Sequence, residues 1–212
     1  IMLEEIGADY RVIPYDIFNG DQLTAEFGRI NPNRKLPAIV DRAPVDGGDP
    51  VAVFESGAIL IHLAEKFSAF LPTEAAKRAE TLSWLMWQMG GVGPNFGQAF
   101  HFLHQHPEDV PDETIEYGRS RYGAEVTRLC NVMNARLAEA AFLAGDDYSV
   151  ADIATYPWVA LHKWFDLDLA ALPNLRRWYD EIKTRPAIRR GMDVPTRDQI
   201  EHHANDHKGE KR

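Results

Sequence analysis

The spacing of apolar residues along the first 70 positions changes several times between helical and strand periodicity. Met2, Leu3 and Ile6 fall on one side of a short helix that Gly7 ends. The predicted elements are a helix at 1–6, a strand at 10–15, a short helix at 23–30, strands at 38–40 and 51–54, and a helix at 57–67. This order predicts a small α/β layer.

From Thr73 onward the apolar positions recur only at helical spacing. The helix at 73–89 is apolar on nearly every face, which is typical of a buried helix, and the glycines and proline at 90–94 are expected to break or kink it. Later helices are expected around Ile115 to Leu137, after Ser149, and from Pro173 and Pro186. We therefore predict a first domain at 1–71 and an all-α domain at 72–212, with a polar tail from about residue 192.

Composition and charge narrow the classes of protein. With 212 residues and 45% apolar content, the chain can bury a sizeable core. A formal charge of −9 argues against nucleic acid as a partner, because phosphate binding needs clustered Lys and Arg. The apolar runs are far shorter than the roughly 18 to 20 residues of a membrane span, so no membrane partner is expected. Cys130 is the only cysteine, which excludes an internal disulfide and suits a reducing compartment.

The junction that follows the strand at 51–54 carries the most specific chemistry. Ser56 is a favourable N-cap residue, and Ile59 three positions later leaves the first amides of the helix available to an anion. Glu55 is negative and suits an ammonium group. Together these groups fit the zwitterion of an α-amino acid. The alternative is an ordinary capping serine beside an exposed glutamate.

Two longer patterns resemble a known family. The strand that opens with Pro37, the second strand, and ESGA at 55–58 opening a helix resemble the thioredoxin-like domain of the glutathione transferases. The segment at 84–98 reads WLMWQMGGVGPNFGQ, and together with HF at 101–102 it resembles the bacterial Nu class of that family. The resemblance implies an α/β plus all-α fold, in which an incomplete thioredoxin-like N-terminal domain precedes an all-helical glutathione transferase domain.

The resemblance also implies which residues bind glutathione: Gln22, Lys35, Leu36, Pro37, Glu55, Ser56 and Arg121. Leu36, before a cis Pro37, would offer its backbone to the cysteinyl unit as an added strand does. Glu55 and Ser56 would hold the γ-glutamyl head. For Arg121 the alternative is a solvated charge on a helix.

The catalytic residue cannot be assigned from this pattern. In the Nu class a threonine or asparagine just after the first strand hydrogen-bonds the glutathione sulfur, and that segment would precede Ile1. The chain is therefore expected to be a fragment of a longer product. Among residues that are present, Asn95 and His101 are the next candidates.

The activity that the resemblance implies is glutathione-dependent disulfide-bond reduction. Glutathione would be the co-substrate, no metal is needed, and the partners would be a second copy in a homodimer and a small disulfide or electrophile in the cytoplasm. Two alternatives remain open. The first is another enzymatic activity, either conjugation of glutathione to electrophiles or peroxide reduction. The second is a non-catalytic binding module with a glutathione transferase fold. Turnover of a small disulfide against that of an aromatic chloride would separate them.

Several chemically suggestive residues have a simpler structural interpretation. Ser149 and Asp152 have the spacing of a capping box, so Asp152 is expected to stabilise a helix rather than to catalyse. Cys130 lies in a helix and is expected to act as a small buried apolar residue. Three histidines of the polar tail have no cysteine nearby with which to complete a zinc site: His202, His203 and His207.

Overall fold

The computed structural model describes residues 1–200. Its internal contacts divide the chain into two compact units, which we call the first unit (1–69 and the chain from Pro186) and the second unit (70–185). The predicted domain limits, 1–71 and 72–212, stay a prediction. The contacts place the helix that starts at Pro186 with the first unit.

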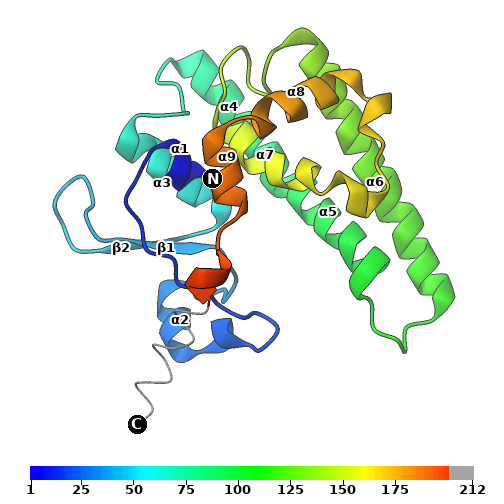
Figure 1. The fold of residues 1–212 in the computed structure, drawn as a ribbon, viewed down its shortest axis with the longest axis horizontal. Helices are drawn as coiled ribbons and strands as arrows, with labels where there is room; N and C mark the ends of the chain where they lie inside the picture. Colours follow the sequence, from blue (N-terminus) through cyan, green and yellow to red (C-terminus); the bar gives the residue numbers. More distant parts are fainter. Residues whose placement is uncertain (201–212) are drawn as a thin grey trace. The chain divides into compact units, whose positions relative to one another are not determined.

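The first unit contains a small antiparallel hairpin and short helices (Figure 1). Its elements are α1 (Met2–Glu5), η1 (Asp21–Leu23), α2 (Ala25–Ile30), β1 (Ala38–Asp41), β2 (Val51–Phe54), α3 (Ser56–Phe67) and α9 (Pro186–Met192). The predicted strands at 38–40 and 51–54 and the helix at 57–67 are thereby confirmed. α3 buries Ile59, Leu60, Leu63 and Ala64, which recur at helical spacing, whereas Phe67, the last apolar residue of that series, is 42% exposed.

The strand predicted at 10–15 does not form. Within residues 1–200 the only sheet has two strands, β1 and β2, so this segment has no neighbouring strand with which to exchange backbone hydrogen bonds. Side chains hold it instead: the Tyr15 ring lies 4.7 Å from that of Phe27, and the Tyr10 hydroxyl donates to Glu4 at 2.6 Å. Apolar residues do alternate in this segment, but a strand also requires a neighbouring strand for its backbone hydrogen bonds.

Helix α9 packs on α1, and the two lie side by side in Figure 1. Arg190 on α9 pairs with Glu4 on α1. Gly191 is also required here, because a Cβ at this position would lie 2.5 Å from the Cα of Ile1. α9 is therefore held to α1 by a close backbone approach and an ion pair.

Asp41, the last residue of β1, fastens the hairpin to α3. The Lys66 ammonium donates to both carboxylate oxygens at 2.6 and 2.8 Å and to the Ala43 carbonyl at 2.6 Å. The Nε2 atom of His62 lies 2.9 Å from the second carboxylate oxygen. The hydrogen bond from Lys66, followed by that from His62, lowers the pKa of the Asp41 carboxyl to about 2.

We expect Asp41→Asn to lower the free energy of unfolding at pH 7 by about 1 to 3 kcal/mol, because charge-assisted hydrogen bonds become neutral ones. A folded-state pKa below the ordinary value of 3.8 means that the ionised carboxyl stabilises the fold above that pH, and that this contribution is lost as the pH falls towards 2. Denaturant titrations at pH 7, 4 and 2 should therefore show a difference from wild type that shrinks below pH 4. Asp180→Asn, in an exposed pair with Arg176, is the control and should change stability by less than about 0.5 kcal/mol. An Asp41→Asn difference that is the same at every pH would contradict this role.

The second unit is helical throughout its regular elements. These are α4 (Ala75–Trp87), η2 (Gln88–Val92), α5 (Gly93–Phe100), η3 (His101–Gln105), α6 (Asp112–Glu139), α7 (Val150–Ala160), η4 (His162–Phe165), η5 (Leu169–Ala171) and α8 (Pro173–Lys183). The predicted helix starts at Pro173 and Pro186 and the long helix through Ile115 are confirmed. Figure 1 shows α5 beside α6, which it contacts.

The predicted break at 90–94 is wrong, since the chain stays helical from α4 to η3. η2 is a π-helical turn in which the Gly93 N–H donates to the Gln88 carbonyl five residues earlier. Pro94 falls in the first turn of α5, where proline is tolerated. The glycines widen the helix instead of ending it, and such π-helical turns often occur at functional sites.

The expectation that the helix at 73–89 is buried on nearly every face is also wrong. Within the described chain, α4 buries Thr81 and Leu85, whereas Met86 is 49% exposed. α4 contacts α7 and η2.

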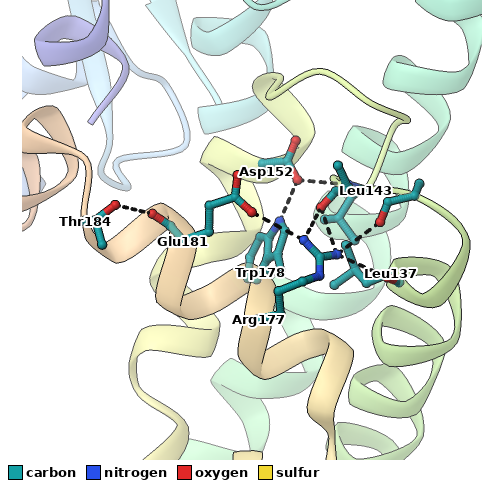
Figure 2. Close-up of polar contacts among 9 residues, drawn as sticks. Leu137, Leu143, Asp152, Arg177, Trp178, Glu181 and Thr184 are labelled. Atoms are coloured by element: carbon teal, nitrogen blue, oxygen red, sulfur yellow. Dashed lines mark hydrogen bonds and ion pairs between the residues drawn. The ribbon is translucent and has the colours of Figure 1, made fainter.

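The predicted capping box at the start of α7 is confirmed and forms part of a larger buried network. Asp152 accepts hydrogen bonds from the Ser149 N–H and hydroxyl, each at 3.0 Å. Figure 2 shows its other two bonds, from the Trp178 indole N–H at 2.8 Å and from the Leu143 N–H at 2.9 Å. Burial raises the pKa of Asp152, while the hydrogen bonds from Leu143, Trp178 and Ser149 oppose that rise. This one carboxyl joins α7, α8 and the loop between α6 and α7.

Arg177, beside Trp178 on α8, ties the end of α6 into the same region (Figure 2). Its guanidinium donates to the carbonyls of Leu137, Ala140 and Ala141 at 3.1 to 3.2 Å. Carbonyls in the last turn of a helix have no intrahelical partner, and a cation there also complements the helix dipole. The second unit is thus held by polar contacts as well as by its apolar core.

Candidate functional site

Four predicted site residues flank one end of the β1–β2 hairpin: Leu36, Pro37, Glu55 and Ser56. The strands pair antiparallel, with the first residue of β1 opposite the last residue of β2. Pro37 precedes Ala38 and Glu55 follows Phe54, so both residues flank the Ala38–Phe54 pair that ends the ladder. The Leu36–Pro37 peptide bond is cis, as the sequence suggested. Hairpin register therefore brings together residues that are about 20 positions apart in the chain.

Leu36 presents its backbone to the surface. The residue is 45% exposed, and among residues 1–200 neither its N–H nor its carbonyl has a hydrogen-bond partner. An unpaired donor and acceptor on one residue are what an extended peptide needs in order to add as a strand. Such pairing recognises a peptide backbone without requiring a particular side chain.

Glu55, not Ser56, is the N-cap of α3, so the predicted capping role of Ser56 is wrong. The chain turns from β2 into α3 at Glu55, whose φ is 68° and ψ is 120°, and Ser56 is the first helical residue. A positive φ at a non-glycine residue costs of order 1 to 3 kcal/mol, and such residues concentrate at functional sites. The turn keeps Glu55 exposed at the helix start.

The electrostatics of this junction suit a zwitterion. α3 has no acidic side chain in its first turn, so its positive end is available to a carboxylate. The Glu55 carboxylate beside it is available to an ammonium group, and its side chain makes no capping hydrogen bond. The positive helix start and the negative Glu55 carboxylate thus lie at adjacent residues.

Gln22 and Lys35 have less distinctive surroundings. The Gln22 side-chain amide donates to the Ile17 carbonyl at 3.3 Å, and its buried Oε1 has no hydrogen-bond partner within residues 1–200. The Lys35 side chain is exposed, while its backbone carbonyl accepts a 2.6 Å bond from Asn31. The predicted glutathione contacts of Gln22 and Lys35 stay a prediction.

The second unit contains a polar hollow of about 280 Å³ lined by Asn95, Arg121, Tyr122 and Glu125. It includes Arg121, which the sequence placed in the site, and Asn95, a fallback candidate for the sulfur. Asn95 is held by its side-chain bond to the Gly91 carbonyl at 2.9 Å, so the π-helical turn η2 orients it. Arg121 is exposed, and its role as a glutathione contact stays a prediction.

Tyr122 and Glu125 were missed as lining residues by the sequence reasoning. For Glu125 the available signal was its spacing of four positions from Arg121 on α6, since residues four apart share a helix face. Tyr122 is one position from Arg121, and that spacing gives no such signal. The hydrogen bond from Arg128 lowers the pKa of Glu125, and the charge of Arg121 adds to this. The Tyr122 ring stacks on Phe102 at 5.6 Å, and Phe102 packs so closely on Gly118 that a Cβ there would lie 2.3 Å from the ring. η3 thereby supports the wall of the hollow.

Cys130 is buried in α6, and burial raises the pKa of its thiol to about 12. A thiol with such a pKa is almost entirely protonated at neutral pH and is a poor nucleophile. The expectation of an inert, packed cysteine agrees with this environment.

Metal and membrane chemistry find no support in the part of the chain that the structure describes. No group of three His, Cys, Asp or Glu side chains in residues 1–200 could hold a metal ion. None of the helices described there has the length and apolar content to cross a bilayer. The tail histidines His202, His203 and His207 lie outside the described residues.

Comparison with family models gives two matches that together cover most of the chain. The model of the glutathione S-transferase N-terminal domain matches residues 1–66. That of the glutathione S-transferase C-terminal domain matches residues 94–186.

Individual proteins are similar over nearly the whole chain. Disulfide-bond oxidoreductase YfcG of Escherichia coli is 48% identical over 187 residues, which is 88% of this chain and 85% of YfcG. Disulfide-bond oxidoreductase YghU of the same organism is 41% identical over 92% of this chain and 69% of YghU. Among solved structures, a glutathione transferase from Burkholderia graminis with two glutathione molecules bound per subunit has a TM-score of 0.84 at 42% identity, covering 92% of this chain and 82% of that one. A Pseudomonas putida glutathione transferase with one glutathione disulfide bound per subunit has a TM-score of 0.83 at 38% identity, covering 92% and 84%.

Proposed function

Because the chain belongs to the glutathione S-transferase family, we propose that it is a glutathione-dependent disulfide-bond reductase. The structural matches confirm the predicted fold class, a thioredoxin-like N-terminal layer followed by a helical domain. The observation that carries the proposal is the unpaired backbone of Leu36 at the end of the hairpin that also carries Glu55 and Ser56. Disulfide-bond oxidoreductase is also the name of the two relatives from Escherichia coli.

Glutathione has the groups that this end of the hairpin recognises. Its cysteinyl unit would exchange backbone hydrogen bonds with Leu36, next to Pro37. Its γ-glutamyl ammonium would pair with the Glu55 carboxylate, and its γ-glutamyl carboxylate would lie at the start of α3 by Ser56. Gln22 and Lys35, together with Arg121 of the second unit, are proposed as further contacts.

The chemistry that follows is thiol–disulfide exchange. A glutathione thiolate attacks one sulfur of the disulfide substrate, which forms a mixed disulfide and releases one thiolate. A second glutathione thiolate attacks the glutathione sulfur of that mixed disulfide, giving glutathione disulfide and the second thiolate. The two glutathione molecules and the glutathione disulfide bound by relatives support this sequence. The protein contributes orientation, and no protein cysteine is required.

The remaining assignments rest on the same chemistry. A reducing cytoplasm would regenerate the glutathione that the reaction consumes. We propose a homodimer as the working form and a small disulfide as the substrate. Conjugation to an electrophile is the second enzymatic candidate, and a binding module would show neither activity.

We expect Arg121→Ala to weaken glutathione binding by about 1 to 3 kcal/mol, which is about 5- to 150-fold, because a charge-assisted hydrogen bond to a carboxylate is lost. Calorimetric titration measures the affinity, and glutathione-dependent turnover of bis(2-hydroxyethyl) disulfide measures the activity. Arg176→Ala is the matched control, since it removes another exposed arginine, which pairs with Asp180 on α8. Cys130→Ser should keep its turnover, because the buried thiol has no role in the exchange.

Two outcomes would count against the proposal. Wild-type turnover of 1-chloro-2,4-dinitrobenzene but not of the disulfide would favour the conjugating transferase. Loss of disulfide turnover in a folded Cys130→Ser protein would move the chemistry to a protein thiolate.

A further inference from the structure

Asn31 is one of the few buried polar residues of the first unit, at 1% exposure, and it lies at the end of α2, a few positions before Leu36. We propose that Asn31 is a positioning residue that aims the Leu36 N–H at the carbonyl of the bound peptide. The inference rests on the proposed function, because it concerns how that site recognises the cysteinyl unit of glutathione.

The backbone of Asn31 is fixed by α2. Its N–H donates to the Phe27 carbonyl at 2.8 Å, which closes the last turn of the helix. Phe27 is buried and its ring lies 4.7 Å from that of Tyr15. The Asn31 side chain therefore extends from a helix end that is anchored in the core.

The Asn31 amide holds the loop that follows from two sides. Its Nδ2 donates to the Lys35 carbonyl at 2.6 Å, and its Oδ1 accepts from the Asn33 N–H at 2.9 Å. The Asn31 carbonyl accepts from the Arg34 N–H at 3.0 Å. An aspartate could replace the acceptor but not the donor, so the contact to Lys35 specifically requires the amide.

The contact to Lys35 determines where the next N–H points. The Lys35 carbonyl and the Leu36 N–H belong to one planar peptide unit, and in the trans form they point in opposite directions. Because Asn31 holds the carbonyl towards the buried side, the Leu36 N–H is directed away from Asn31. It is the same N–H that has no partner within residues 1–200. Removing the amide frees this peptide unit to rotate and misdirects the donor.

The experiment compares glutathione with an analogue that cannot accept the bond. In this analogue an alkene isostere replaces the peptide bond between cysteine and glycine, so the cysteinyl carbonyl is absent. Calorimetric titration of wild-type protein should give an affinity ratio, glutathione over isostere, of about 10, the worth of one well-made hydrogen bond. In Asn31→Ala and in Asn31→Asp, glutathione should bind about tenfold more weakly, the isostere should bind as it does to wild type, and the ratio should approach 1.

The control separates positioning from stability. Asn134→Ala removes another partly buried asparagine, whose Oδ1 accepts from the Asn174 and Leu175 N–H groups in the second unit. It should lower the melting temperature and leave the ratio near 10. A wild-type ratio of 10 that persists in folded Asn31→Ala or Asn31→Asp protein would overturn the role of Asn31 while leaving the proposed function intact. Failure of wild-type protein to bind glutathione would overturn both.

Discussion

Asp152→Ala is expected to lower the free energy of unfolding by about 3 to 5 kcal/mol, near the upper end for a single substitution. The carboxyl accepts four hydrogen bonds, and three of the donors are fixed groups: the Leu143 and Ser149 N–H and the Trp178 indole. Each buried donor left without an acceptor costs about 1 to 3 kcal/mol. Urea unfolding followed by tryptophan fluorescence would measure the loss.

Two further variants make this expectation specific. Asp152→Asn keeps the shape but turns an NH₂ group towards some of these donors, so it should also destabilise, by less than the alanine variant. Asp147→Ala removes an exposed aspartate five residues earlier and should stay within about 0.5 kcal/mol of wild type. An Asp152→Ala protein as stable as Asp147→Ala would show that water replaces the carboxyl and that the network in Figure 2 contributes little.

The elements that the sequence predicted correctly are those whose signals are local. Ser149 and Asp152 are three residues apart, and their spacing alone specifies the capping box. Pro173 and Pro186 mark helix starts for an equally local reason, the fixed φ of proline. The segment at 10–15 failed because its alternation describes a strand only when another strand lies beside it.

The sequence predicted the features of the candidate site that have local signals and missed those that depend on the folded loops. The two short apolar runs and the turn-rich segment between them predicted the two strands whose shared end carries Pro37 and Glu55. The positive φ of Glu55 could not be predicted from the sequence, because a glutamate disfavours a positive φ and only the conformation of the whole turn imposes this angle. The proposed role of Asn31 could not be predicted from the sequence either, since it depends on a loop conformation and not on the neighbouring residues in the chain. The assignment of glutathione contacts to these residues stays a prediction that binding measurements decide.

Glu55→Gly is expected to move binding and stability in opposite directions. Loss of the carboxylate removes the partner of the γ-glutamyl ammonium, which should weaken glutathione binding by about 10- to 100-fold. Glycine adopts a φ of 68° without steric cost, so relief of strain should raise the free energy of unfolding by about 1 kcal/mol, even after the larger entropy of unfolded glycine. Calorimetric titration and denaturant unfolding of the same preparation measure both quantities.

Matched variants separate the two effects. Glu55→Ala keeps the strained backbone, so it should lose affinity as the glycine variant does without gaining stability. Asp166→Gly relieves a positive φ of 52° in the second unit and should leave glutathione affinity unchanged. If Glu55→Gly bound glutathione as wild type does, the carboxylate would have no part in recognition. If instead both Glu55 variants lost stability equally, the side chain rather than the backbone would matter to the fold. Opposite shifts in Glu55→Gly alone would mean that the strain at this turn is retained because it holds a carboxylate where the ligand ammonium binds.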